Sequence, residues 1–136
     1  MKSSKIHVAL VGAGRIADAA HLPAWKEQTD ARVTLVVENH PERAEWIARQ
    51  WEIPEWVTDY RTVLERGDIQ AVDLCLPPHL HAPVTEEFLA RGKHVLVEKP
   101  MATNLDDARR MVMAAAGSEA VLMVAENWPF ASSTRR

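Results

Sequence analysis

The hydrophobic pattern of the chain alternates between two kinds of segment. Short, continuous apolar runs rich in β-branched residues are typical of strands that are buried on both faces. Between them, apolar residues recur at every third or fourth position, which predicts amphipathic helices. The predicted strands are 6–11, 33–37, 56–58, 71–76, 93–97 and 121–125, the third being the weakest. The predicted helices are 15–28, 41–51, 60–66, 83–92 and 104–116.

Proline, glycine and capping residues mark the helix boundaries. Pro41 and Pro83 stand where the first helical residue is expected, because that position needs no N–H donor. Gly92 follows the helix that Pro83 opens, and Thr103 and Asn104 offer capping oxygens to the next helix. The stripe that this last helix is expected to bury consists of Leu105, Ala108, Val112 and Ala115.

This order of elements predicts an α/β fold. A strand–helix–strand unit is right-handed and joins parallel strands, so its repetition gives a doubly wound parallel sheet with helices on both faces, the Rossmann fold. Six strands suit such a sheet, which binds its ligand across the carboxyl ends of the strands. The length of 136 residues is enough for one domain. We expect that domain to occupy residues 1–127, with 128–136 as a tail.

Composition narrows the classes of partner. Apolar residues make up 47% of the chain and charged residues 26%, the balance of a globular protein. The net charge is −3 and the basic residues are interspersed, so neither nucleic acid nor a membrane is an expected partner. The sequence contains no run of 18 apolar residues. Cys75, the one cysteine, is expected to be a small buried core residue, and the expected compartment is cytoplasmic.

A glycine-rich motif follows the first predicted strand. Residues 12–17 have the form G-x-G-x-x-A, which indicates dinucleotide binding when it joins a buried strand to a helix. Gly12 permits the tight turn, and Gly14 lets a pyrophosphate approach the backbone. The helix that begins at Arg15 and Ile16 offers free N–H groups and a positive dipole end to the same phosphates. These four residues are therefore predicted to bind the cofactor.

An acidic residue ends the second predicted strand. Glu38 can accept hydrogen bonds from both ribose hydroxyls of a dinucleotide, and it would repel a 2′-phosphate. Asn39 follows it in place of an arginine. Both residues are predicted to contact the cofactor, and NAD is favoured over NADP.

Two further segments follow the fourth and fifth strands. Residues 77–81 and 98–100 would both face the nicotinamide half of the cofactor. A lysine at a strand end, Lys99, could donate to a substrate hydroxyl or carbonyl oxygen, with Pro100 fixing its loop. The histidines of residues 77–81 lack a nearby third ligand, so no metal is predicted.

Together these pieces resemble the Gfo/Idh/MocA family, named after glucose–fructose oxidoreductase and inositol dehydrogenase. The resemblance covers nearly the whole chain, and the Glu-Lys-Pro that follows a Gly-Lys-His strand is its most specific element. The matching stretches are residues 11–17, 21–24, 41–44, 80–83 and 92–102.

The resemblance implies a two-domain oxidoreductase that transfers hydride between NAD(P) and a hydroxyl or carbonyl of a sugar, polyol or similar small molecule. It implies that Lys99 contacts the reacting oxygen as the catalytic residue and that Pro77, His81 and Glu98 line the nicotinamide end. The family's acidic position after the second strand is usually Asp and is Glu38 here. Its proton-transfer residues, commonly an Asp and a His of a C-terminal α/β domain, have no counterpart in this chain.

Two interpretations follow. The first is the nucleotide-binding domain of such an oxidoreductase, inactive alone, as an expressed fragment, a truncated gene product or half of a two-chain enzyme. The alternative, from another class, is a non-catalytic module that binds or senses a dinucleotide. A short-chain dehydrogenase fits worse, since the Tyr-x-x-x-Lys it needs would start at Tyr60, which is followed by Leu64 at the fourth position.

The last predicted strand, 121–125, is expected at the edge of the sheet. Edge strands invite pairing with another strand, and no Lys or Arg guards residues 120–131. Trp128 and Phe130 would add an apolar patch. We therefore predict a homo-oligomer that uses this C-terminal segment.

Overall fold

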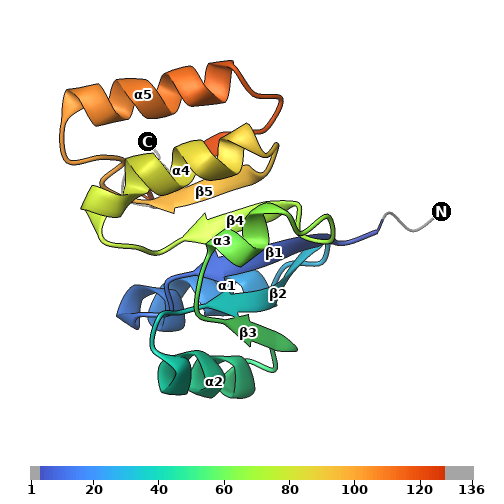
Figure 1. Cartoon of the computed structure of the whole chain (residues 1–136). Coiled ribbons are helices and arrows are strands. Elements are labelled where there is room, and N and C mark those ends of the chain that lie inside the picture. Colours follow the sequence, from blue (N-terminus) through green and yellow to red (C-terminus); the bar gives the residue numbers. More distant parts are fainter. Residues whose placement is uncertain (1–3, 128–136) are drawn as a thin grey trace, which may run out of the picture.

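The computed structural model of the chain describes residues 4–127, and it confirms the doubly wound parallel sheet (Figure 1). Within this range the sheet has six strands in the order β3-β2-β1-β4-β5-β6, with every neighbouring pair parallel. The strands are β1 Ile6–Val11, β2 Ala31–Val37, β3 Glu55–Val57, β4 Ala71–Leu74, β5 His94–Glu98 and β6 Leu122–Ala125. The helical elements are η1 Ala17–His21, α1 Leu22–Lys26, α2 Pro41–Gln50, α3 Arg61–Leu64, η2 Pro78–Leu80, α4 His81–Ala90 and α5 Leu105–Ala116.

Two apolar cores lie on the two faces of the sheet. Successive residues of β1 belong alternately to the two cores, with Leu10 in one core and Ala9 and Val11 in the other. The smaller core packs α1 and α2 over β1 and β2, and the larger one packs α3, α4 and α5 over the opposite face. Right-handed crossovers account for this split, because the chain moves outward from β1 to β3 and then returns to run through β4, β5 and β6.

A π-helical turn, η1, precedes α1 in the first crossover. The Leu22 N–H donates to the carbonyl of Ala17, five residues earlier. Pro23 explains the widened turn, since it has no N–H to continue the usual ladder and its ring crowds the preceding carbonyls. Such turns recur at functional sites, and this one ends at His21.

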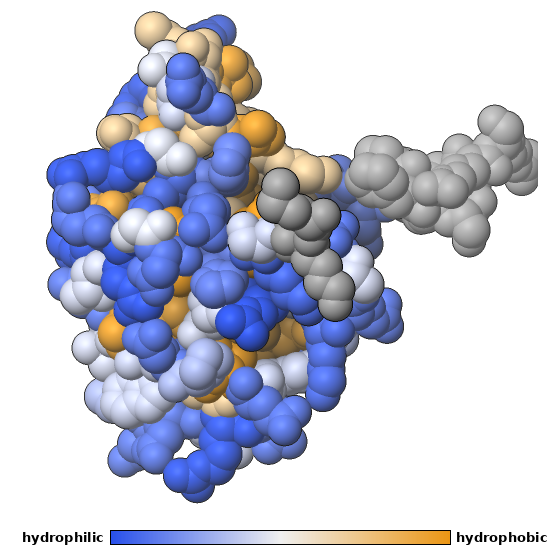
Figure 2. All heavy atoms as spheres, turned by 90° about the vertical axis from the view of Figure 1, so that its right-hand side faces the viewer, coloured by the Kyte–Doolittle hydropathy of each residue, from blue (hydrophilic) through white to orange (hydrophobic). Residues whose placement is uncertain are grey.

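Two expectations about helices were wrong. The helix α4 begins at His81 rather than at Pro83, because a 3-10 turn from Pro78 leads into it. In α5, Leu105 and Val112 are 71% and 57% exposed, whereas Met111 is fully buried. The outermost helix of the layer packs along a narrow line, and apolar atoms therefore reach the surface at the top of the molecule, at the height of α5 (Figure 2).

The capping prediction at α5 is confirmed. The Asn104 side chain accepts a hydrogen bond of 2.8 Å from the Asp107 N–H, which closes the first turn of the helix. Among residues 4–127, the structure contains no helix with the length and apolar character needed to cross a membrane.

Candidate functional site

The glycine-rich turn joins β1 to the first helical turn at the carboxyl edge of the sheet. Gly12 has a φ of +90°, and a Cβ there would lie 2.5 Å from the carbonyl oxygen of Cys75. Gly14 is different, since a Cβ on it would meet nothing within 4 Å. Ala13 and Ala17 are fully buried, so the helix packs tightly against the strands. The turn therefore exposes backbone at Gly14 and is locked at Gly12.

A cleft of about 990 Å³ opens beside this turn. It extends from the glycine-rich turn to the residues that follow β2 and β4, which is where a doubly wound sheet binds its ligand. The predicted site residues that line it are Gly12, Gly14, Arg15, Ile16, Glu38, Asn39 and Pro77. The sequence interpretation missed the segment 58–61 after β3, which lines the same cleft. That segment follows a weak strand, so its place at the sheet edge had little local signal.

Glu38 binds the glycine-rich turn directly. One carboxylate oxygen accepts from the Ala13 N–H at 3.0 Å, and the other accepts from the His40 N–H at 3.1 Å and lies 3.0 Å from the His40 imidazole. Burial by itself would raise the pKa of this carboxyl, but the hydrogen bonds from Ala13 and His40 outweigh it and hold the pKa below its ordinary value. Glu38 is therefore a carboxylate at neutral pH.

An arginine that the sequence interpretation missed lies at the same turn. Arg43 of α2 donates from Nε to the Ala13 carbonyl at 2.8 Å, and its guanidinium stacks on Trp46 at 4.8 Å. Sequence position gave no sign of this, because Arg43 reaches the turn only through the packing of α2 beside β1 and β2.

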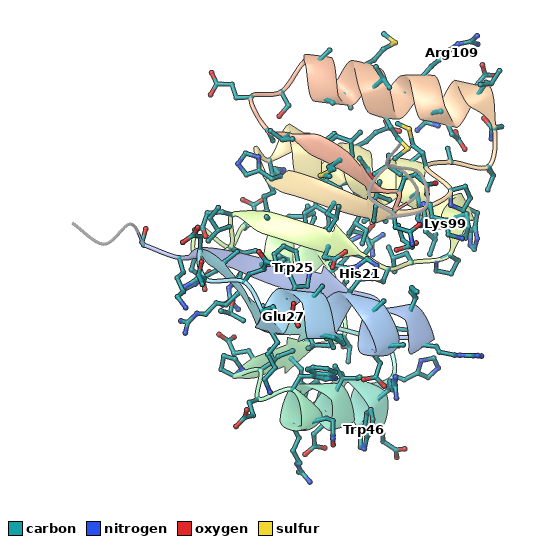
Figure 3. All side chains as sticks on the ribbon, turned by 180° about the vertical axis from the view of Figure 1, so that it is seen from behind. His21, Trp25, Glu27, Trp46, Lys99 and Arg109 are labelled. Atoms are coloured by element: carbon teal, nitrogen blue, oxygen red, sulfur yellow. The ribbon has the colours of Figure 1, made fainter. Side chains whose placement is uncertain are left out.

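Lys99 and Glu98 line a second hollow, of about 630 Å³. It lies over β5 and β6, on the face that carries α1, and Ile16 lines both hollows. Lys99 is exposed at the carboxyl edge of the sheet, directly after β5 (Figure 3). The Lys99–Pro100 peptide bond is cis. The two groups of predicted site residues therefore lie on adjoining hollows rather than in one.

His81 is a correction to the predicted site. Its side chain is fully buried and lines neither hollow. Its ring nitrogens lie 2.8 Å from the Pro100 carbonyl oxygen and 2.7 Å from the Leu76 carbonyl oxygen. The first turn of α4 directs it beneath the Lys99–Pro100 turn, so its ring supports that turn instead of lining either hollow. His79, two residues earlier, is exposed.

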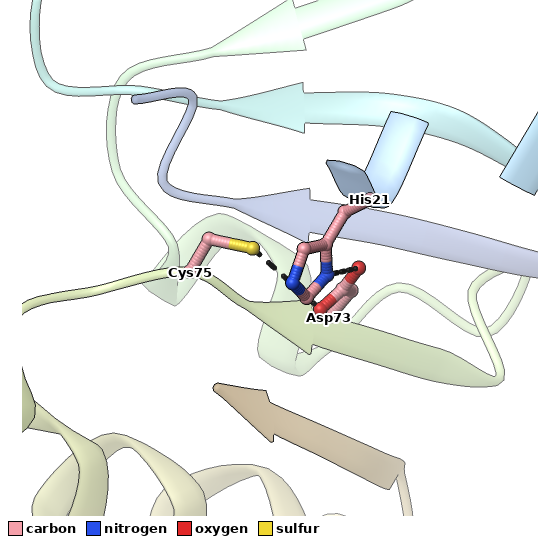
Figure 4. A group of neighbouring side chains, drawn as sticks. All are labelled: His21, Asp73 and Cys75. Atoms are coloured by element: carbon pink, nitrogen blue, oxygen red, sulfur yellow. Dashed lines mark hydrogen bonds and ion pairs between the residues drawn. The ribbon is translucent and has the colours of Figure 1, made fainter. Parts of the chain in front are cut away.

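A partly buried polar cluster, which the sequence interpretation missed, lies between α1 and the sheet (Figures 3 and 4). His21 places Nδ1 2.8 Å from Asp73 Oδ2 and Nε2 2.5 Å from Glu98 Oε2. Trp25 donates from Nε1 to the same Asp73 oxygen at 2.7 Å. The hydrogen bond to Asp73 is the largest cause that raises the pKa of His21, to about 9, against the lowering effect of burial. The lone carboxylate of Asp73 in an apolar run was the available sequence signal, because a buried charge requires a partner.

Cys75 lies close enough to His21 and Asp73 for the three side chains to be considered as metal ligands. His21, Asp73 and Cys75 each offer a ligand atom within 4.8 Å of the others (Figure 4). Both ring nitrogens of His21 already contact carboxylates, and the Cys75 thiol lies 3.7 Å from Asp73. Burial raises the pKa of the thiol, which disfavours the thiolate that a metal needs. The cluster is explained by its own hydrogen bonds.

The sheet order, the locked glycine turn and the cleft beside it define a dinucleotide-binding Rossmann domain. The family described as "Oxidoreductase family, NAD-binding Rossmann fold" matches residues 6–126. The chain therefore belongs to the Gfo/Idh/MocA oxidoreductases, of which it is the NAD(P)-binding domain.

Relatives of known activity agree with this assignment. The chain is 35% identical over 125 residues to dTDP-3,4-didehydro-2,6-dideoxy-alpha-D-glucose 3-reductase of Saccharopolyspora spinosa, covering 92% of this chain and 37% of the relative. The structure of KijD10, a 3-ketoreductase from Actinomadura kijaniata in complex with NADP and TDP-benzene, matches with a TM-score of 0.84 and 34% identity, covering 90% of this chain and 37% of that one.

An oxidoreductase from Agrobacterium radiobacter in complex with NAD+, L-tartaric acid and magnesium matches with a TM-score of 0.88 and 26% identity, over 93% of this chain and 37% of that one. The chain thus spans little more than a third of these relatives. One solved relative holds NADP and another NAD+, so the comparisons support NAD(P) without deciding between the two forms.

Proposed function

We propose that the dinucleotide lies across the carboxyl edge of the sheet, with its pyrophosphate on the glycine-rich turn. The observation that carries this is the contrast between Gly12, which is locked against Cys75, and Gly14, whose missing side chain leaves the backbone open to the cleft. Arg15 and Ile16 begin the helical segment there and line the same cleft. Glu38 and Asn39 lie at the ribose of the adenosine half, and Pro77 lies toward the nicotinamide half.

We propose that the whole protein is an NAD(P)-dependent oxidoreductase acting on a hydroxyl or carbonyl of a sugar, polyol or similar molecule. The bound nicotinamide would accept or donate the hydride. Lys99, exposed at the end of β5, would hydrogen-bond the reacting oxygen, and Glu98 would lie beside the nicotinamide end. The sugar-nucleotide reductases among the relatives support this class of substrate.

We further propose that NAD(H) is preferred. The Glu38 carboxylate would accept from the ribose hydroxyls and repel a 2′-phosphate. Titration calorimetry with NAD+ and NADP+ tests this, with Glu38→Ala expected to narrow the preference and Glu52→Ala, an exposed acid outside the cleft, as the control. Tighter binding of NADP+ by the wild-type chain would show that the role assigned to Glu38 is wrong.

Hydride transfer is expected to need more than this domain. Such catalysis requires a substrate held against the nicotinamide together with an acid–base group, and the relatives devote most of their length to parts that this chain does not span. The purified chain should therefore bind NAD(H) without reducing NAD+ in the presence of polyols. Robust turnover with any polyol would contradict this.

The edge strand supports a proposal about assembly. β6 is an edge strand of the sheet, and Val121, just before it, and Met123, within it, are 60% and 52% exposed. We propose a homo-oligomer that pairs through this edge; Trp128 and Phe130, expected to contribute, lie outside the described residues. Sedimentation of the chain beside a version ending at Glu126 tests it. A wild-type monomer at tens of micromolar, roughly the range of weak interfaces, would refute it.

A further inference from the structure

The turn that carries Lys99 is held from two sides by histidines. On one side, the buried His81 contacts the carbonyl of Pro100 at 2.8 Å. On the other side, His21 contacts the Glu98 carboxylate at 2.5 Å. Lys99 stands between these two anchored residues, while its own side chain is exposed to the hollow over β5 and β6.

The second anchor continues into the centre of the sheet. His21 also contacts Asp73, a residue of β4 that is fully buried, and Asp73 is fixed further by Trp25. A continuous chain of hydrogen bonds therefore runs from a central strand, through the first crossover helix, to the residue before Lys99. Rigid strands and packed helices locate such a chain more closely than a loop could do alone.

The hydrogen bonds from His21 to Asp73 and Glu98 require a particular protonation state of the His21 imidazole. A neutral imidazole has one N–H donor, so it can donate to one carboxylate only and would turn a lone pair toward the other. Two carboxylates on opposite nitrogens are satisfied together only when both nitrogens carry protons. The raised pKa of His21, about 9, agrees with this state. With His21 charged, one positive charge bridges two negative ones and the Glu98 side of the turn is held in place.

We propose that His21 is a positioning residue that fixes the direction of Lys99 by clamping Glu98 to Asp73 across the first crossover. This inference rests on the proposed role of Lys99 at the nicotinamide end. Asp73 faces His21 from β4, Glu98 from β5, Cys75 from the residue after β4 and Trp25 from α1, and Lys99 and Glu126 line the same hollow.

The first test follows the wild-type chain alone by NMR, so it does not depend on the folding of a variant. The imidazole signals of His21 should show two protonated nitrogens at neutral pH and titrate near pH 9. The amide signals of Lys99 and Met101 should shift with the same midpoint, whereas that of the distant Asn104 cap should not. A neutral His21 at pH 7, or Lys99 and Met101 signals indifferent to its titration, would overturn the proposal.

The second test measures where Lys99 points, by mass-spectrometric acetylation of the full chain with and without NADH. At NADH about ten times its Kd, a lysine covered by the cofactor should be acetylated about tenfold more slowly, by mass action. We expect this protection in the wild type and in His7→Gln, which removes a histidine at the amino end of β1, away from both hollows. In His21→Gln the protection of Lys99 should be lost, while calorimetry shows an NADH affinity near that of the wild type.

The outcomes separate the two proposals. If the wild-type chain fails to bind NADH, the proposed function is contradicted. The NMR titration would then still test whether His21 fixes the turn that carries Lys99. Wild-type chain that binds NADH with Lys99 protected equally in His21→Gln would overturn the clamp and leave the function intact. Acetylation of the exposed Lys26 in the same sample normalises the rates.

Discussion

Replacing Gly12 by alanine should damage the fold, although it adds a single methyl group. A Cβ at this position would lie 2.5 Å from the Cys75 carbonyl oxygen and 2.9 Å from its carbonyl carbon, and both atoms belong to backbone. Two hydrogen bonds meet beside the contact, from Gly12 to Val37 and from Cys75 to Val11, each 2.8 Å. The backbone segments at Gly12 and Cys75 therefore cannot move apart without disturbing the carboxyl edge of the sheet.

The expected magnitude combines two costs. A side chain at a φ of +90° is disfavoured by about 1 to 2 kcal/mol, and forcing a methyl group into a filled space costs about 1 to 3 kcal/mol more. We therefore expect a loss of about 3 kcal/mol, a large part of the roughly 5 to 15 kcal/mol that stabilises a typical domain. With a slope of about 2 kcal/mol per molar urea, the unfolding midpoint should fall by about 1.5 M.

Gly14→Ala is the matched control, two residues along the same turn. Its added Cβ would meet nothing within 4 Å, so the free energy of unfolding should stay within about 0.5 kcal/mol of the wild-type value. Its effect should instead appear as weaker NADH binding, about tenfold or more, because the methyl group stands where the pyrophosphate would approach. An unchanged midpoint in Gly12→Ala, or equal destabilisation in both variants, would refute the steric reasoning.

Three further predictions concern stability in urea. The pKa of His21 in the folded chain, about 9, lies above its ordinary value of 6.5. Its charge should therefore contribute about 2 to 3 kcal/mol to the free energy of unfolding below pH 6.5, and this contribution should disappear as the pH rises through 9. A stability advantage of the wild type over His21→Gln that persisted at pH 10 would contradict this. Lys93→Met should cost about 2 kcal/mol, because the buried ammonium donates to the carbonyls of Arg66 and Ile69; the exposed Lys26→Met is the neutral control. Asn104→Ala should cost about 1 kcal/mol through loss of the α5 cap, and Asn104→Ser should restore most of it.

The fold followed from the sequence because its signals are local. A continuous apolar run can be satisfied only where both faces are covered, and the right-handed crossover then leaves few topologies. The glycine-rich turn was also readable, because the spacing of Gly12, Gly14 and Ala17 states where the backbone must turn, stay open and pack closely. Even the edge position of 121–125 followed from strand order.

Tertiary packing decided which face of a helix is buried and which distant side chains meet. The stripe predicted for α5 was wrong at Leu105 and Val112, because Met111 rather than Val112 meets the layer beneath, whereas Ala115 does pack against the core. His81 was assigned to the cleft from its place after a strand, whereas the early start of α4 turns its ring under Pro100. A sequence states which residues are near in the chain, and these contacts depend on how separate elements pack.

The His21 cluster shows the same limit most clearly. Its three ionisable members, His21, Asp73 and Glu98, come from three elements and lie 25 to 77 residues apart, by the separations of Glu98 from Asp73 and from His21. Each alone reads as an ordinary residue: a scattered histidine, an acid in a strand and an acid at a strand end. The sequence determined that Asp73, placed in a buried strand, required a charged or hydrogen-bonding partner. Only the packing of the first crossover against β4 and β5 decided that the partner is His21, because hydrogen bonds at 2.5 and 2.8 Å need atoms brought together in space.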